Sequence, residues 1–182
     1  MNQRIFDLIN GPAGDFSALD RLAEFFAQYG LYVLVGIVAV LGLRLVLADR
    51  HRGLVVAAAG ALALGLAGLG ILGAASVVTE DRPFVHDSET VLLINHSADS
   101  GFPSDHSTIA AAIAMVAALA WRRLWPLFAG VAAAVGLARV FVGVHYPGDV
   151  AAGWAIGVLS ALLAWYAVQF IVKRRPGLAA RT

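Results

Sequence analysis

The sequence predicts an all-α fold: a polytopic membrane helical bundle of about five transmembrane helices with an N-terminal interfacial amphipathic helix. The chain of 182 residues is 60% hydrophobic and only 14% charged, whereas soluble domains carry roughly 25% charge. The apolar residues also gather into runs close to the roughly 20 residues that a membrane span requires. These runs cover residues 31–48, 53–78, 106–121, 124–144 and 150–172.

The first 30 residues differ from the spans. Residues 17–29 place apolar side chains at helical spacing, which indicates an amphipathic helix lying in the membrane interface. Acidic residues interrupt this N-terminal segment, so it does not read as a cleavable signal peptide. We therefore expect a single domain, 1–182, with interfacial helices in 1–30, a transmembrane core in 31–172 and a cytoplasmic tail in 173–182.

Charge and residue types exclude several classes of protein. The formal net charge is only +1, which gives no sign of nucleic-acid binding. The chain has no cysteine, so disulfides, thiolate chemistry and cysteine-based zinc sites are excluded. Gly153 and Gly157 form a GxxxG face in the fifth span. We interpret them as packing positions, because small residues let helix backbones approach closely in lipid.

Basic residues predict the orientation of the bundle. They gather at three points that a five-span topology places on one side, namely Arg50 and Arg52, Arg122 and Arg123, and Lys173 onward. The positive-inside rule makes that side cytoplasmic. The opposite side carries a long, acidic loop from about 79 to 105. Because a long loop in a compact protein is usually functional or disordered, we expect the functional groups on the outer side.

Three polar clusters converge on that side. They are Arg82-Pro83 after the second span, Ser104, Asp105 and His106 at the start of the third, and Arg139, His145 and Asp149 between the fourth and fifth. Two arginines suit phosphate, since each guanidinium offers a planar fork of donors to its oxygens. Ser104 lies at an expected helix N-cap, where free backbone N–H groups attract anions. The clusters therefore predict a phosphate-binding site.

The remaining groups can carry out chemistry on that phosphate. The two histidines, His106 and His145, supply a nucleophile and a general acid. Asp149 is placed to hold one imidazole in the correct tautomer. With no metal-like cluster beside it, this set predicts phosphoryl transfer by positioning and charge stabilisation. Each residue also has a structural alternative; Asp149, for example, could cap the fifth span near Pro147.

Other ionisable residues need separate interpretation. His86, His96 and Asp99 share the outer loop and could bind a metal ion, but their spacing is irregular. Hydrogen bonding within the loop is the interpretation we favour. Arg139 lies within the apolar stretch 135–144. An ionisable residue at membrane depth is functional by default, so Arg139 is the hardest of the candidates to explain structurally.

Taken together, the clusters resemble the motifs of the type 2 phosphatidic acid phosphatase (PAP2) superfamily, which read Lys-x6-Arg-Pro, Pro-Ser-Gly-His and Ser-Arg-x5-His-x3-Asp. The chain departs from this pattern at three positions: Ala75 for the lysine, Asp105 for the glycine and Ala138 for the serine. The segments RPFV, VLLINHSAD and FPSDHST are similar to the bacitracin-resistance type of undecaprenyl-diphosphate phosphatase within this superfamily. The pattern of residues from Asn2 to Tyr29 is similar as well.

That resemblance implies an enzyme of the bacterial cytoplasmic membrane. Its partner would be a membrane lipid, undecaprenyl diphosphate, which it would convert to undecaprenyl phosphate at the outer face. The reaction would recycle the cell-wall lipid carrier and confer bacitracin resistance. By position, His145 would be the nucleophile that forms a phosphohistidine and Asp149 would orient it. His106 would protonate the leaving oxygen and then activate water.

The binding residues follow from the same resemblance. Arg82, Ser104 and Arg139 would bind the transferred phosphoryl group. Asp105 would tune His106 or contact the substrate, and the alanine at position 75 leaves one phosphate contact unassigned. The resemblance implies no metal and no other cofactor.

Three alternatives stay open at this point. The substrate could be another lipid phosphate, such as phosphatidylglycerol phosphate or another prenyl phosphate. The chain could be a non-catalytic membrane subunit, for example a partner of a transporter. A degenerate member of the superfamily would bind lipid phosphate without cleaving it, although both histidines are present.

Overall fold

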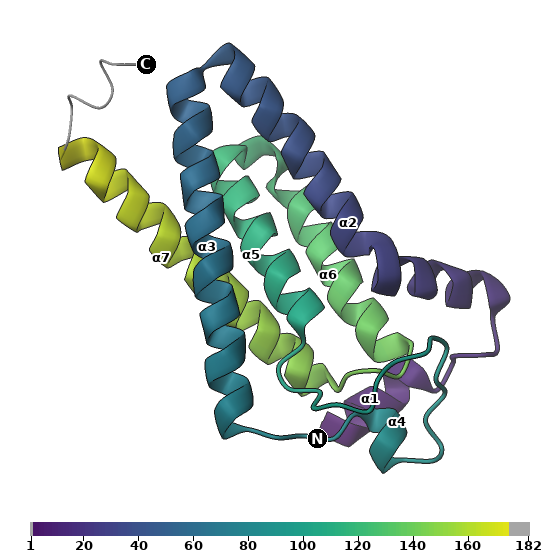
Figure 1. Cartoon of the computed structure of the whole chain (residues 1–182). Coiled ribbons are helices and arrows are strands. Elements are labelled where there is room, and N and C mark those ends of the chain that lie inside the picture. Colours follow the sequence, from purple (N-terminus) through teal and green to yellow (C-terminus); the bar gives the residue numbers. More distant parts are fainter. Residues whose placement is uncertain (1, 175–182) are drawn as a thin grey trace.

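The chain folds into a bundle of long helices with two short helices at one end (Figure 1). The computed structural model describes residues 2–174, and within them the secondary structure is helical, with no strand. Residues 175–182 of the predicted tail lie outside the described residues. The elements are α1 (Asn2–Asn10), α2 (Ser17–Ala48), α3 (Arg50–Val77), α4 (Pro83–His86), α5 (Asp105–Ala120), the 3-10 helix η1 (Arg122–Leu124), α6 (Trp125–Phe141) and α7 (Pro147–Arg174).

The prediction of an all-α membrane bundle is confirmed. Within residues 2–174, four segments are long and apolar enough to cross a membrane: α2, α3, η1 with α6, and α7. The fifth predicted span corresponds to α5, which has only 16 residues and is therefore about 24 Å long. This helix contacts α2, α3, α6 and α7, so the shortest span is the centre of the bundle. Large apolar side chains of α2, α3 and α7 point outward, as expected for surfaces that face lipid.

Close contact between α5 and α7 depends on two glycines. A Cβ at Gly153 would lie 2.8 Å from both the Ser104 carbonyl oxygen and the Thr108 Oγ1. At Gly157, a Cβ would collide with the Thr108 carbonyl oxygen and lie 2.9 Å from the Ala111 Cβ. The GxxxG face predicted from the sequence is therefore a packing surface, and it joins the central helix to the last one.

The N-terminal segment differs in part from the prediction. A short helix, α1, is present, but residues 17–29 are not a separate interfacial helix. They are the first turns of α2, which continues to Ala48, and Figure 1 shows these turns running at an angle to the rest of the helix. Ala23 and Ala27 are buried in a cluster that includes Phe141 at the end of α6. This packing explains the amphipathic pattern, since the small side chains face protein.

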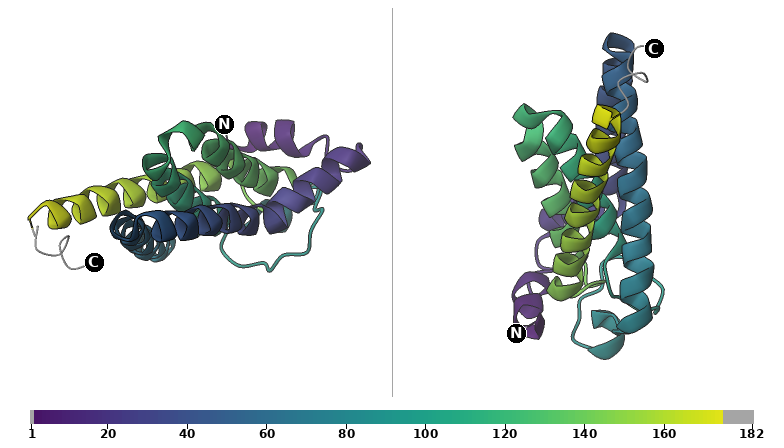
Figure 2. Two further views of the ribbon diagram at one scale, coloured as in Figure 1. Left: turned by 90° about the horizontal axis from the view of Figure 1, so that it is seen from above. Right: turned by 90° about the vertical axis from the view of Figure 1, so that its left-hand side faces the viewer.

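Functional and basic segments lie at opposite ends of the bundle. Helices α1 and α4 and the long loop between α3 and α5 surround one end, as the right-hand view of Figure 2 also shows. The turn between α2 and α3 and the C-terminal end of α7 lie at the other end (Figure 1). Arg50 and Lys173 lie at those far termini. The three polar clusters are thus brought together at the end away from these basic residues.

The glycine contact leads to a first prediction. Gly157→Ala should lower the unfolding temperature in detergent, because the new methyl group meets the backbone of α5 and overpacking costs about 1–3 kcal/mol. Gly130→Ala on α6 is the matched control, since a Cβ there meets no atom within 4 Å. The melting temperatures can be measured by intrinsic tryptophan fluorescence, since the chain has no cysteine for a thiol dye. Equal thermal stability of the two variants would contradict the role assigned to this contact.

Candidate active site

A cavity of about 250 Å³ lies at the end of the bundle where the polar clusters meet. Its wall combines α3, the loop after it, the start of α5, the end of α6 and the turn before α7. Five of the seven residues predicted for the site line it: Arg82, Asp105, His106, Arg139 and His145. The other two, Ser104 and Asp149, are buried directly behind this wall.

His145 and Asp149 lie four residues apart around the start of α7. The Asp149 Oδ2 is 3.4 Å from the His145 Nδ1, within reach but without the alignment of a hydrogen bond. The same oxygen accepts a hydrogen bond from the Tyr146 backbone N–H at 2.8 Å. Asp149 therefore caps α7, the structural alternative considered from the sequence, and also lies next to the imidazole.

The protonation of His145 follows from its neighbours. Its Nε2 is 3.2 Å from Nη1 of Arg82. Arginine only donates, so Nε2 is the acceptor and the ring proton lies on Nδ1, facing Asp149. Burial, and after it the charges of Arg139 and Arg82, hold the pKa of the His145 imidazole well below its usual value. Nε2 of this imidazole therefore lies against the Arg82 guanidinium, and both side chains line the cavity.

Arg82 is held by the backbone and by one acidic residue. It follows α3 and precedes Pro83, and its side chain is only 7% exposed. Nη1 donates to the Val144 carbonyl at 3.0 Å, and Nη2 donates to the Ser100 carbonyl at 3.4 Å. Nε forms an ion pair with Asp99 at 2.9 Å, although that carboxylate is 63% exposed. A partly exposed anion thus occupies one face of a buried guanidinium.

Arg139 is the second buried cation of the site. It lies in the last turn of α6, where Nη1 donates to the Ala27 carbonyl at 3.3 Å. Nη2 donates to the His96 Nε2 at 2.9 Å, and Nε has no partner. Arg139 therefore brings a second guanidinium, the kind of group that binds phosphate oxygens, to the wall of the cavity.

Ser104, Asp105 and His106 lie at the start of α5. Ser104 is the N-cap residue, as predicted, but its side chain makes no capping hydrogen bond. Its hydroxyl instead accepts a hydrogen bond from Ser107 at 3.0 Å, and its backbone N–H donates to the Asp149 carbonyl at 3.2 Å. Ser104 therefore joins α5 to α7 behind the wall, while the next two residues face the cavity.

Sequence reasoning did not identify the partners of the two arginines. Asp99 and His96 each bind a guanidinium, and both line the cavity. The signal was present, because the segment VLLINHSAD contains both and contributed to the family resemblance. Within residues 2–174, no group of three histidine or acidic side chains could hold a metal ion. His86 lies in a separate hollow, next to Tyr146.

Two buried arginines and two imidazoles, one of them beside a carboxylate, meet in one cavity of a membrane bundle and suit the binding of a phosphate group. The comparison with family models agrees, since the PAP2 superfamily model matches residues 53–173. The chain belongs to the PAP2 superfamily and is a phosphatase. This match covers the spans from α3 to α7, including every residue of the three predicted clusters.

Two relatives and one solved structure place the chain more closely. It is 36% identical to the putative undecaprenyl-diphosphatase YbjG of Escherichia coli (strain K12) over 96% of this chain and 88% of that protein. It is 35% identical to the undecaprenyl-diphosphatase BcrC of Bacillus subtilis (strain 168) over 90% of this chain and 82% of that protein. The crystal structure of Aquifex aeolicus LpxE has the same fold, with a TM-score of 0.73, 24% identity, and coverage of 89% of this chain and 93% of that one.

The ion pair between Arg82 and Asp99 leads to a second prediction. Asp99→Ala should lower the KM for a phosphate substrate, because the carboxylate competes with phosphate oxygens for Arg82. The change should not exceed about fivefold, since the carboxylate of this pair is largely in solvent and such pairs contribute only about 0–1 kcal/mol. Glu89→Ala, which removes another acid of the same loop, controls for the general loss of negative charge. A KM that rises in Asp99→Ala alone would show that this carboxylate assists binding.

Proposed function

We propose that this phosphatase hydrolyses undecaprenyl diphosphate to undecaprenyl phosphate and phosphate at the outer face of the cytoplasmic membrane. The reaction would recycle the cell-wall lipid carrier and confer bacitracin resistance. One observation carries the proposal: two buried arginines and two imidazoles line a single cavity at one end of a membrane bundle. The relatives named undecaprenyl-diphosphatase, which match nearly the whole chain, support the choice of substrate.

In the first step, His145 attacks the terminal phosphorus. Without substrate, Arg82 donates a hydrogen bond to the Nε2 lone pair. The Arg82 guanidinium must therefore turn to the incoming phosphate before Nε2 is free to attack. The bond from Nε2 to phosphorus forms as the bond from phosphorus to the bridging oxygen breaks. His106 donates a proton to that oxygen, and undecaprenyl phosphate leaves. Asp149 stabilises the positive charge that develops on the imidazole.

In the second step, water releases the phosphate. His106, now neutral, takes a proton from water, and the resulting hydroxide attacks the phosphohistidine. The nitrogen–phosphorus bond breaks, inorganic phosphate is released, and the neutral imidazole of His145 is regenerated. Throughout, Arg82 and Arg139 stabilise negative charge on the phosphoryl oxygens inside a buried site, where such interactions are stronger than in water. No step requires a metal ion.

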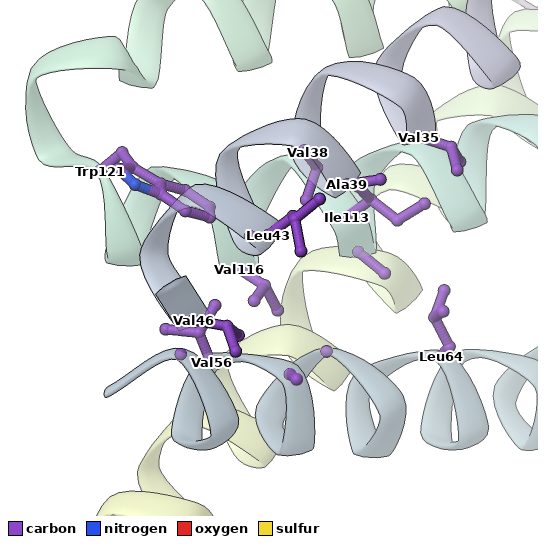
Figure 3. Close-up of a pocket in the computed structure, with 15 residues that line it drawn as sticks. Val35, Val38, Ala39, Leu43, Val46, Val56, Leu64, Ile113, Val116 and Trp121 are labelled. Carbon is purple, nitrogen blue, oxygen red and sulfur yellow. The ribbon is translucent and has the colours of Figure 1, made fainter. Parts of the chain in front are cut away.

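A second cavity suits the lipid chain. It has a volume of about 440 Å³, lies between α2, α3 and α5, and is lined by apolar residues such as Val38, Leu43 and Trp121 (Figure 3). Leu64 lines this second cavity, an apolar groove between the three helices, whereas Ile71, seven residues further along α3, lines the catalytic cavity. Seven residues are two turns, so both side chains lie on one face of α3, about 10 Å apart. A prenyl chain could follow this face away from its diphosphate.

Charge supports an outward-facing site. The basic turn between α2 and α3 and the end of α7 lie at the end of the bundle opposite the cavity (Figure 1). The positive-inside rule then assigns that end, and the C-terminus with it, to the cytoplasm. An outer site is also where a diphosphate carrier released by cell-wall synthesis would be found.

The first test of this function measures phosphate release from undecaprenyl diphosphate by the purified chain. His145→Ala should abolish turnover, because it removes the attacking nitrogen. Asp149→Asn should keep the fold and lose about 10⁴-fold in kcat, because the imidazole would adopt the wrong tautomer. Near wild-type turnover by a folded His145→Ala protein would rule out the phosphohistidine. A clear preference for phosphatidylglycerol phosphate in the same assay would instead reassign the substrate.

The groove gives a prediction about chain length. Gly60 lines it, and a Cβ there meets no atom within 4 Å. Gly60→Leu should therefore fill the groove without disturbing the fold, and should raise the KM for undecaprenyl diphosphate more than for geranyl diphosphate, whose chain ends sooner. Gly65→Leu is the matched control, since Gly65 lies on the same helix with equally open surroundings but outside the groove. If both variants changed the two KM values equally, the groove would not be the binding site of the prenyl chain.

Orientation can be measured directly. The natural chain has no cysteine, so single cysteines can be introduced without background. In intact cells, an impermeant thiol reagent should label Ser88→Cys in the loop beside the cavity and spare Arg123→Cys between α5 and α6. Labelling of position 123 with protection of position 88 would mean that the bundle has the opposite orientation.

A further inference from the structure

The catalytic cavity contains a third imidazole that the mechanism above does not use. His96 comes from the long loop between α3 and α5 and is half-buried in the cavity wall. Its Nε2 lies 2.9 Å from Nη2 of Arg139, and its ring centre lies 6.5 Å from that of His145. This histidine is therefore adjacent both to the attacking group and to one of the cations expected to hold the phosphate.

One wall of the cavity offers no donor to a phosphate. That wall belongs to α3, and its residues are Ile71 and Ala75. A bound diphosphate carries several negative charges, yet the buried cations Arg82 and Arg139 stand on other elements. Any further charged donor must therefore come from the loop or from the start of α5, and His96 is the loop side chain already in contact with a buried guanidinium.

We propose that His96 is a substrate-binding residue that donates a hydrogen bond to the phosphate and so supplies the contact that the alanine at position 75 cannot make. The inference rests on the phosphatase mechanism proposed above and assigns one more residue of the same site. It concerns phosphate recognition and is independent of which lipid carries the phosphate.

The state of His96 in the empty site fits this role. Nε2 accepts from Arg139, and Nδ1 lies 3.2 Å from the Ser97 carbonyl, so the neutral ring carries its proton on Nδ1. Burial, opposed in part by the Ser97 carbonyl, and then the charges of Arg82 and Arg139 lower the pKa of His96. An entering phosphate attracts the Arg139 guanidinium and brings negative charge. Nε2 is then free to become protonated, and its N–H donates a hydrogen bond to a phosphate oxygen.

A purely structural role would be different. If His96 only held Arg139 in place, a new cation elsewhere in the cavity would not replace it. If it binds phosphate, a lysine on the bare α3 wall should restore the lost contact. Ala75 lines the cavity and its methyl group is exposed, so a longer side chain at this position can extend into the space that the substrate occupies.

The experiment compares kcat/KM for four purified full-length variants on undecaprenyl diphosphate and on a phosphatidic acid. His96→Ala should lose roughly 10- to 100-fold, the usual effect of a charge-assisted hydrogen bond. His96→Gln, which keeps a donor, should lose less. Adding Ala75→Lys to His96→Ala should recover at least about tenfold of the loss. His86→Ala is the control, because this exposed histidine at the end of α4 lines another hollow.

The outcomes separate cleanly. Activity of His96→Ala within twofold of wild type, or equal activity of His96→Ala and the double variant when both melt like wild type, would overturn the inference. Should the lysine variant unfold, the difference between His96→Gln and His96→Ala decides, and equal losses in the two would overturn it. If the wild type cleaves the phosphatidic acid but not undecaprenyl diphosphate, the proposed substrate fails, while the variants are still compared on the former.

Discussion

The site depends on the contact that holds the first turn of α5 against the first turn of α7. The Ser104 backbone N–H donates to the Asp149 carbonyl, and Gly153 lets the Ser104 carbonyl approach α7. This contact fixes His106, on α5, relative to His145, which lies in the turn before α7. Both helices are anchored along their length by small residues, so neither imidazole can shift without moving a membrane span.

Burying two arginines in an apolar bundle is costly unless their donors are satisfied. Backbone carbonyls accept some of these donors: those of Val144 and Ser100 for Arg82, and that of Ala27 for Arg139. Carbonyls carry no net charge, so they hold the guanidinium groups in place without neutralising them. The positive potential of the cavity therefore stays available to an anionic substrate. Asp99 forms an ion pair with Arg82, but that carboxylate is largely in solvent.

Helix α1, outside the spans, holds the elements around the cavity together. The Asn10 side chain, at the end of α1, bonds the backbone of Val91 in the long loop and of Phe141 at the end of α6. The Asn2 side chain accepts from the Gly148 backbone N–H at the start of α7. These bonds tie the loop that carries His96 and Asp99 to the helices that carry Arg139 and Asp149. The N-terminal helix thus contributes to the site without lining it.

The sequence by itself determined the membrane class, the number of apolar segments and the residues of the three clusters. These properties are local, because hydrophobic runs, helix-packing glycines and spaced motifs are read along the chain. Only the tertiary structure decided that residues 17–29 join the first span, that Asp99 and His96 bind the two arginines, and that Ser104 lies behind the wall. Each of these depends on contacts between residues far apart in sequence, such as Arg139 with Ala27, and no periodicity records such a contact.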